Sequence, residues 1–306
     1  MLLVRSPLGR RIGFVSGCHD CGLVFSNPLP SSDQLKAFYS LTGEWRRSDR
    51  SDAVRATASV DAARGGSWSR PFAPIRHELP VTTPPPGAAV LDFGCGTGKL
   101  LDAMQACGWD TSGIEPAVDV AFPRHRRLDA VPDEPRFDLI VANHVLEHVT
   151  DPLGLLRQFA RACRPGGYLF VGVPRFDTLP LHRDLKYVIN GRAHVIAYTW
   201  PCLEGLLART GWAAVGPPPE RVAIGAGRTT CSRLQVIARR VDTPPAQPAS
   251  PALAARDAMR QYHLQTEGRS LVERLRFFRL AARRAEAQRR RRKMIGKSAK
   301  IGTAIS

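Results

Sequence analysis

Residues 90–101 read VLDFGCGTGKLL, and this stretch decides the fold. An apolar run ends here, glycines occupy every second position at Gly94, Gly96 and Gly98, and a helical pattern follows. Glycine lets the backbone turn sharply and lets a ligand approach without a clash against Cβ. The free N–H groups at the start of the next helix point toward such a ligand. The stretch therefore predicts a strand, a ligand-binding turn and a helix.

An acidic residue follows at the end of the next predicted strand, where Glu115 lies within DTSGIEP, residues 110–116. A carboxylate at this position can accept hydrogen bonds from two ribose hydroxyls. The glycine spacing is G-x-G-x-G preceded by Asp92, which differs from the G-x-G-x-x-G of dinucleotide enzymes. For the glycines alone, a tight turn without a ligand is the alternative. The strand, turn, helix and acid together favour ligand binding.

The rest of the chain alternates between strand and helix patterns from Ala88 onward. Apolar runs predict strands within residues 88–94, 110–116, 137–145, 168–174, 212–218 and 232–240. Helical spacing occurs within residues 98–109, 152–167 and 199–212. Strands that alternate with helices indicate a parallel sheet covered on both faces. We expect an α/β fold with a Rossmann-like doubly wound sheet that is mostly parallel and ends in an antiparallel strand.

Composition shifts divide the chain into three parts. We expect a small N-terminal segment at 1–80, the ligand-binding domain at 81–240, and a Pro/Ala linker with a basic helical tail at 241–306. Residues 255–306 hold 15 Lys and Arg against four acids, so much of the net charge of +17 belongs to the tail. No apolar run reaches the roughly 20 residues of a membrane span, and no secretory signal is recognisable. Seven scattered cysteines fit a reducing compartment, so we expect a cytoplasmic protein.

Four stretches now point to a family. VLDFGCGTG, GIEP, FDLIVANHVLEHVTDP and RPGGYLFVGVP resemble successive motifs of the class I S-adenosylmethionine-dependent methyltransferases. The resemblance is closest to a bacterial group that acts on small molecules or glycans, and it covers residues 88 to about 215. It implies S-adenosyl-L-methionine as the cofactor. The cofactor contacts that it implies are Asp92, Gly94, Cys95, Gly96, Gly98, Glu115, Asp129, Ala130, Asn143 and His144.

The resemblance also implies a role for each of these contacts. Asp92 and the glycine turn face the methionine part, and Glu115 takes the ribose hydroxyls. Asp129 and the Ala130 backbone lie near the adenine, while Asn143 and His144 close the fourth strand beneath the cofactor. Only 13 residues separate Glu115 from Asp129, so the helix and strand between them are shortened. A solvated loop acid is the alternative for Asp129.

Candidate bases for an acceptor proton are His144, His148 and His194, with His148 and His194 proposed as catalytic. On a helix, the four-residue spacing of His144 and His148 would place both on one face beside Glu147, as in some metal sites. The sequence shows no third ligand, so we expect no metal there. Structural or capping histidines are the alternative for His148 and His194.

These residues predict methyl transfer to a small-molecule, sugar or lipid-linked acceptor, by O- or C-methylation. The alternatives are a cofactor-binding module without turnover and a nucleic-acid methyltransferase that uses the basic tail. Nucleic acid is not an expected partner, because the chain has ANHV in place of an Asn-Pro-Pro-Tyr-type motif for exocyclic amines. The tail at 255–306 is a candidate for contact with the inner membrane surface or a partner protein, and a solvated helix is the alternative.

A C-x-x-C at Cys18 and Cys21 resembles the second half of a zinc ribbon. The first half has no cysteines here, and Cys202 and Cys231 have no evident reason to lie near. We therefore expect a packing role without metal, with Phe38 and Tyr39 forming part of a lid beside the acceptor site. A redox role and zinc bound through an unusual ligand set are the alternatives.

Overall fold

The computed structural model describes residues 14–18, 20–35, 39, 67–116, 121–176, 188–189, 193–216, 233–243, 245 and 255–256. Residues Met1–Met259 form one compact unit. The second unit, Arg260–Ser306, lies outside the described residues, as does almost all of the predicted basic tail.

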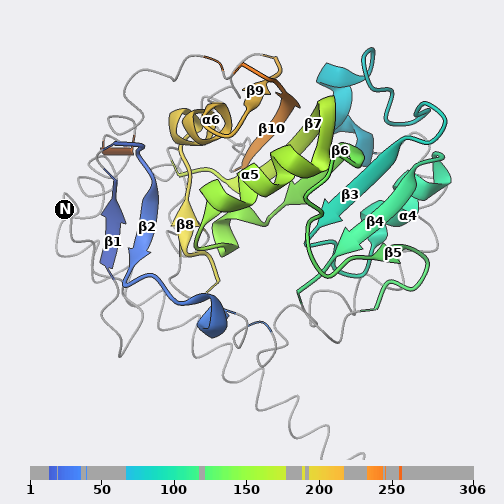
Figure 1. Cartoon of the computed structure of the whole chain (residues 1–306). Coiled ribbons are helices and arrows are strands. Elements are labelled where there is room, and N and C mark those ends of the chain that lie inside the picture. The colour runs from blue at the N-terminus through green and yellow to red at the C-terminus, as the bar shows by residue number, and fades with distance from the viewer. Residues whose placement is uncertain are drawn as a thin grey trace, which may run out of the picture. The chain divides into compact units, whose positions relative to one another are not determined.

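A seven-stranded sheet forms the body of the first unit, in the order β5-β4-β3-β6-β7-β10-β9 (Figure 1). Its strands are β3 (Ala89–Phe93), β4 (Asp110–Ile114), β5 (Arg126–Arg127), β6 (Phe137–Asn143), β7 (Cys163–Pro174), β9 (Trp212–Ala214) and β10 (Arg233–Arg240). The pairs from β5 to β7 are parallel, and β10 runs antiparallel to both β7 and β9. The predicted doubly wound sheet with an antiparallel last strand is confirmed.

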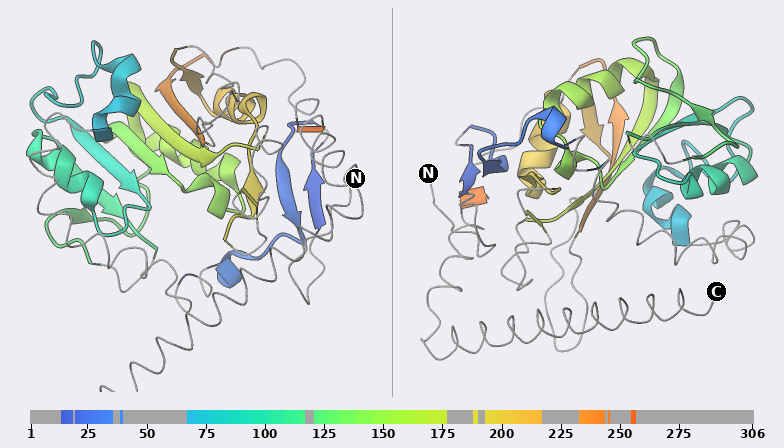
Figure 2. Two further views of the ribbon diagram at one scale, coloured as in Figure 1. Left: turned by 180° about the vertical axis from the view of Figure 1, so that it is seen from behind. Right: turned by 90° about the horizontal axis from the view of Figure 1, so that it is seen from below.

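Helices cover both faces of this sheet. They are α4 (Lys99–Ala106), α5 (Pro152–Ala162), α6 (Trp200–Ala208) and the 3-10 helices η2 (Ser67–Ile75) and η3 (Leu146–His148). Figure 2 shows α5 on one side of the sheet, and α4 with η2 on the other. Because successive strand residues point to opposite faces, Leu91 and Ile140 lie in one core and their neighbours Val90 and Leu139 in the other.

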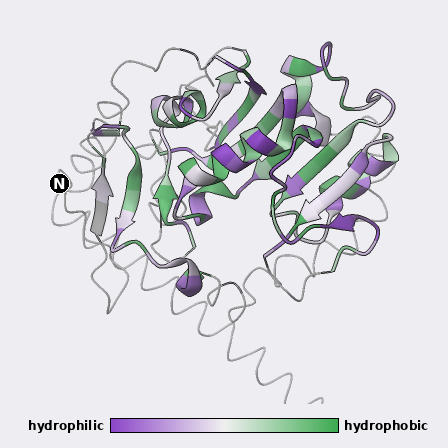
Figure 3. Cartoon of the chain, viewed as in Figure 1, coloured by the Kyte–Doolittle hydropathy of each residue, from purple (hydrophilic) through white to green (hydrophobic). Residues whose placement is uncertain are grey.

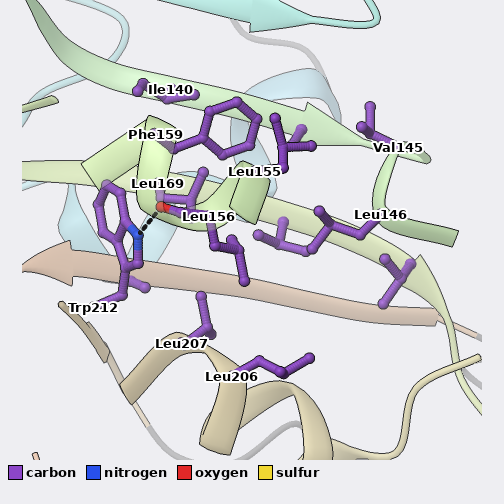
Figure 4. Packing of buried hydrophobic residues seen from close by; sticks show 14 of the residues in the cluster. Ile140, Val145, Leu146, Leu155, Leu156, Phe159, Leu169, Leu206, Leu207 and Trp212 are labelled. Atoms are coloured by element: carbon purple, nitrogen blue, oxygen red, sulfur yellow. Dashed lines mark hydrogen bonds between the residues drawn. The ribbon is translucent and has the colours of Figure 1, made fainter. Parts of the chain in front are cut away.

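The larger core lies between the sheet, α5 and α6 (Figure 4). Trp212 is fully buried in it, and its indole Nε1 donates a hydrogen bond to the carbonyl of Leu156 at 3.1 Å. This bond satisfies the one polar atom of a large apolar side chain. The central strand β3 is apolar except for Asp92 near its end, whereas the edge strand β5 consists of two exposed arginines (Figure 3).

Local sequence signals set the ends of the helices. The Asp151 carboxylate accepts a hydrogen bond from the Gly154 N–H at 2.9 Å, and Pro152 opens α5. Thr199 caps α6 in the same way at 3.4 Å. Near the N-terminus, Ser31 and Gln34 exchange side-chain to backbone bonds of 3.2 and 2.9 Å, which is a capping box.

A second, three-stranded sheet lies beside the main one, in the order β1-β2-β8. It contains β1 (Phe14–Gly17), β2 (Val24–Asn27) and β8 (Ile196–Ala197). The β1–β2 hairpin carries Cys18 and Cys21 at its turn, and β2 pairs antiparallel with β8 (Figure 1). The N-terminal hairpin thus joins a strand that follows β7 by more than twenty residues. No helix among the described residues has the length and apolar character needed to cross a bilayer.

Candidate functional site

The glycine turn after β3 has the backbone shape that only glycine adopts readily. Gly94, Gly96 and Gly98 have φ angles of 76°, 54° and 80°, which all lie in the left-handed region. The Gly94 N–H donates to the Ile114 carbonyl at 2.7 Å, which ties the turn to the end of β4. A Cβ on Gly94 would lie 2.9 Å from Cγ2 of Val145, so the turn also fits closely against the segment after β6.

Two carboxylates flank this turn. Glu115 is 8% exposed, and its Oε2 accepts a hydrogen bond from the Gly96 N–H at 2.9 Å. Asp92 is 5% exposed at the end of β3. Burial, and then the charge of Glu115, raise the pKa of Asp92 to about 8. Two buried carboxylates at one turn suit a ligand that carries both positive charge and hydroxyl groups.

The other residues predicted to contact the cofactor differ in their exposure. Cys95 is buried, and a Cβ on Gly113 would lie 2.7 Å from its Sγ, so this thiol is in the core beneath the turn. Asp129 and Ala130 are exposed, directly after Leu128, whose N–H donates to the Gly113 carbonyl at 2.9 Å. The shortened strand predicted before Asp129 is the two-residue β5. A contact of Asp129 or Ala130 with the adenine stays a prediction.

The chain turns sharply where β6 ends. Asn143 is exposed at the last position of the strand, and His144 follows with a φ of 58°. Left-handed φ values are uncommon outside glycine and often mark functional segments. The His144 N–H donates to the Gly172 carbonyl at 2.7 Å, and its Nδ1 lies 2.8 Å from Oε1 of Glu147. His144 and His148 therefore do not share a helix face but meet the same carboxylate.

Glu147 is the centre of a cluster that the sequence did not indicate. Its side chain is fully buried, its Oε1 lies 3.7 Å from Nε2 of His148, and its Oε2 has no hydrogen-bond partner among the described residues. The rings of His148 and His194 meet edge to face with centroids 4.8 Å apart. One potential ligand atom from each of Glu147, His148 and His194 lies within 4.8 Å of the other two. The sequence shows no third ligand beside His144 and His148, whereas the fold brings His194 to His148 and Glu147. The expectation of no metal there stays a prediction.

Backbone pairing brings His194 to this place. The Val195 N–H donates to the Glu147 carbonyl at 2.8 Å, and the Ser26 N–H donates to the Val195 carbonyl at 2.9 Å. The hairpin strand β2 thus holds the segment 193–197 against η3. Contacts between segments so distant in the chain leave no local sequence signal, which is why the sequence did not join His194 to His148.

Tyr39 also reaches the cluster, from the N-terminal segment. Its hydroxyl lies 2.5 Å from Nδ1 of His148, and the Ala193 carbonyl lies 3.0 Å from the same nitrogen. Burial raises the pKa of Tyr39, and the charges of Glu147 and Glu115 raise it further. Tyr39 thus lies against the cluster. Phe38, the other predicted lid residue, lies outside the described residues.

The cysteine knuckle lies on the far end of the hairpin. A hydrogen bond from the Cys21 backbone is the main cause that lowers the pKa of Cys18, whereas burial raises that of Cys21. Charge on Cys21 and Cys18 adds to burial in raising the pKa of Cys202. The expectation that Cys202 has no reason to lie near the knuckle is therefore wrong. Cys231 lies outside the described residues, and no metal-spaced group found within them includes Cys18 or Cys21.

Comparisons with known proteins agree with the motifs. Residues 67–215 match the family model described as a methyltransferase domain. A ubiquinone biosynthesis O-methyltransferase of Xanthomonas campestris pv. campestris (strain B100) is 35% identical over 102 residues, which cover 28% of this chain and 43% of the relative. The enzyme of the same name from Paracidovorax citrulli is 29% identical over 155 residues, or 45% of this chain and 59% of the relative. The chain thus spans about half the length of these curated relatives.

Among solved structures, the likeness is weaker. The 1,6-didemethyltoxoflavin-N1-methyltransferase of Burkholderia thailandensis, solved with 1,6-didemethyltoxoflavin and S-adenosylhomocysteine, is 18% identical with a TM-score of 0.49. That match covers 78% of this chain and 99% of the other chain.

Proposed function

Because residues 67–215 carry a class I S-adenosylmethionine-dependent methyltransferase domain, we propose that this protein transfers a methyl group from S-adenosylmethionine to a hydroxyl oxygen of a small organic acceptor. The single observation that carries the choice of oxygen is the buried carboxylate of Glu147, which lies between His144 and His148. Glu147 follows Val145, the residue that packs against Gly94 of the glycine turn, by two positions. An oxygen acceptor has to lose a proton, and these side chains are placed to assist that loss.

The residues around the glycine turn fit the cofactor. The Glu115 carboxylate at the glycine turn suits the ribose hydroxyls. Asp92 lies beside it with a raised pKa, and the cationic methionine part of the cofactor would favour its ionised form. When bound, S-adenosylmethionine supplies a methyl group that the sulfonium already makes electrophilic. The chain then has to hold the acceptor oxygen in line with that methyl and handle its proton, and positioning contributes up to roughly 7–11 kcal/mol.

The names of the curated relatives support an oxygen acceptor on a small molecule, since both are called O-methyltransferases. His148 and His194 are the acceptor-side residues in this proposal, as the sequence predicted. Sugars, lipid-linked compounds and carbon acids belong in the same acceptor panel, because each of them also loses a proton when it is methylated.

The proposal is tested in two steps on the full chain. Calorimetry with S-adenosylhomocysteine measures cofactor binding, and transfer of a labelled methyl group to phenols, enols, sugars and polyprenyl phenols measures turnover. We expect Glu147→Gln and His194→Gln to lower turnover at least about tenfold while cofactor binding stays within a factor of about two. The matched control is His77→Gln, because His77 is an exposed histidine outside the cluster.

Two outcomes of these measurements would contradict the proposal. Absence of S-adenosylhomocysteine binding removes the cofactor assignment. Binding without turnover on the whole panel favours a non-catalytic binding module, for which the two-residue β5 is the supporting observation.

The basic residues at 255–306 are proposed to contact an anionic membrane surface. Cosedimentation with vesicles that contain an anionic lipid, compared with neutral vesicles, tests this contact. We expect binding only to the anionic vesicles and its loss when residues 255–306 are deleted. Equal binding to both vesicle types, or strong salt-dependent binding to RNA or DNA instead, would contradict it and favour a partner of another class.

A further inference from the structure

We infer that Glu147, His148 and His194 bind a divalent metal ion of the zinc type, and that the acceptor hydroxyl takes an open position on this ion. The metal site stands on the geometry of the three side chains. Only the part that concerns the acceptor rests on the proposed function.

The spacing of the three side chains suits one ion. Their potential ligand atoms all lie within 4.8 Å of one another, and Oε1 of Glu147 lies 3.7 Å from Nε2 of His148. Zinc binds nitrogen and oxygen at about 2.0–2.2 Å, so two ligands of a tetrahedral ion are about 3.4 Å apart. Only a small side-chain movement separates the observed arrangement from coordination.

The hydrogen-bond partners of His148 favour a proton on Nδ1 and none on Nε2, the ring nitrogen that faces Glu147. Two oxygens lie near Nδ1: the Ala193 carbonyl at 3.0 Å, which can only accept, and the Tyr39 hydroxyl at 2.5 Å, which can accept or donate. A proton on Nδ1 serves both oxygens, so we assign the ring proton there. In the neutral ring, Nε2 then presents a lone pair to the Glu147 carboxylate. A cation placed between two electron-pair donors that face each other would be stabilised by both. An imidazole whose other N–H binds a carbonyl is the usual arrangement of a metal ligand.

The burial of Glu147 supports the same conclusion. Its side chain is fully buried, and a buried carboxylate is costly unless it is paired or coordinates a metal. Its Oε1 meets Nδ1 of His144 at 2.8 Å, whereas its Oε2 has no hydrogen-bond partner among the described residues. A metal ion would satisfy the oxygen that lacks a partner within that part of the chain.

The donor set indicates the class of metal. Two imidazoles and one carboxylate are the ligands of catalytic zinc sites, in which three protein ligands leave a further position open. Calcium and magnesium prefer sites made of oxygen alone. His148 and His194 are half-buried, which is compatible with an open position for a ligand from solution.

The open position defines what the metal does in the proposed reaction. The acceptor hydroxyl binds the ion, its O–H bond breaks, and the proton passes to water because metal coordination lowers the pKa of a bound hydroxyl. The resulting oxygen anion forms a bond to the methyl carbon as the carbon–sulfur bond breaks. The electron pair of that bond returns to sulfur, so the sulfonium becomes a neutral thioether. No oxidant or reductant is required.

The test measures zinc on the full chain after chelator treatment and dialysis. All variants carry Cys18→Ser and Cys21→Ser, so that these two thiols cannot compete for the added zinc. Calorimetry and elemental analysis with zinc chloride, and then with magnesium chloride, measure affinity and stoichiometry. The variants are Glu147→Gln and His194→Ala, with His77→Ala as the matched control, and S-adenosylhomocysteine binding reports whether each variant is folded.

We expect about one zinc per chain in the Cys-to-Ser background and in the His77→Ala control. Zinc affinity should fall at least about 100-fold in Glu147→Gln and His194→Ala, with S-adenosylhomocysteine binding retained. Absence of zinc binding in a background that still binds S-adenosylhomocysteine overturns the metal site, and so does equal zinc binding in all variants. Zinc binding without S-adenosylhomocysteine binding upholds the metal site and overturns the proposed function instead.

Discussion

The hydroxyl of Tyr39 lies 2.5 Å from Nδ1 of His148, although 109 residues separate the two in the chain. Their rings also meet edge to face with centroids 5.7 Å apart. Tyr39 precedes residues 67–215, the range that matches the methyltransferase domain. A residue outside the matched range therefore contacts a side chain of the candidate site.

Replacing Tyr39 by Phe tests this role. Phe keeps the ring contact but removes the hydroxyl that shares Nδ1 of His148 with the Ala193 carbonyl. Loss of such an outer partner costs about 10–100-fold in metal affinity, and we expect zinc affinity to fall by about tenfold. Calorimetry measures both ligands, and S-adenosylhomocysteine binding should not change. Unchanged zinc affinity in Tyr39→Phe would show that the Ala193 carbonyl alone orients the ring.

Asp92 should make stability fall as pH rises. Burial and Glu115 raise its pKa from 3.8 in the unfolded chain to about 8 in the folded protein. Between these values the folded state binds more protons than the unfolded state, so the stabilising contribution is complete below pH 3.8 and is lost as pH rises through about 8.

The measurement for Asp92 is denaturant unfolding across this pH range, for the wild type and for Asp92→Asn. We expect the difference in free energy of unfolding between the two to change by at most about 1.4 kcal/mol per pH unit. The variant should have the flatter profile. Parallel profiles would mean that Asp92 stays ionised in the folded protein.

Glu115→Gln should weaken cofactor binding while it keeps the turn in place. The glutamine amide oxygen can still accept the Gly96 N–H, which Glu115 accepts at 2.9 Å, but the charge toward the ribose is lost. Hydrogen bonds to charged groups contribute about 1.5–3 kcal/mol, so we expect a loss of about tenfold or more in S-adenosylhomocysteine affinity. Glu134→Gln, which changes an exposed acid, is the control. Equal affinities in the two variants would remove Glu115 from the cofactor site.

Gly113 should not tolerate alanine, for a steric reason. A Cβ there would lie 2.7 Å from Cys95 Sγ and 2.9 Å from both Leu101 and Phe122. Overpacking of this kind typically costs about 1–3 kcal/mol, and we expect weaker S-adenosylhomocysteine binding because Cys95 belongs to the turn. Gly87→Ala is the control, since Gly87 has a φ of 76° but no atom within 4 Å of the added Cβ. It should lower stability through its backbone alone and leave binding unchanged.

Most of the fold could be predicted from the sequence because its signals are local. Apolar runs predicted six of the seven strands of the main sheet, all except β5, and helical spacing predicted α4, α5 and α6. The glycine turn and Glu115 were also predictable, because both lie where a strand of a parallel sheet ends. The cofactor part of the site therefore depends on residues close together in sequence.

For the proposed acceptor part of the site, the sequence predicted His148 and His194 but not that they meet each other and Glu147. His194 reaches Glu147 only through the Val195 backbone bond, and that bond depends on pairing with the distant strand β2. On one helix, His144 and His148 would share a face, but His144 has a left-handed φ of 58° and lies before the 3-10 helix η3. Long-range pairing and one left-handed residue thus decide which histidines meet.

The pairing of β2 with β8 has a consequence for how this protein is cut and expressed. A shortened chain that starts at Ser67, where the domain match begins, would leave the strand Ile196–Ala197 without its neighbour. A bare, apolar strand edge invites pairing with other chains and aggregation. The same cut would remove Tyr39 and release the segment that carries His194. We therefore expect that the shortest stable and active fragment of this protein has to include residues that precede the matched range 67–215.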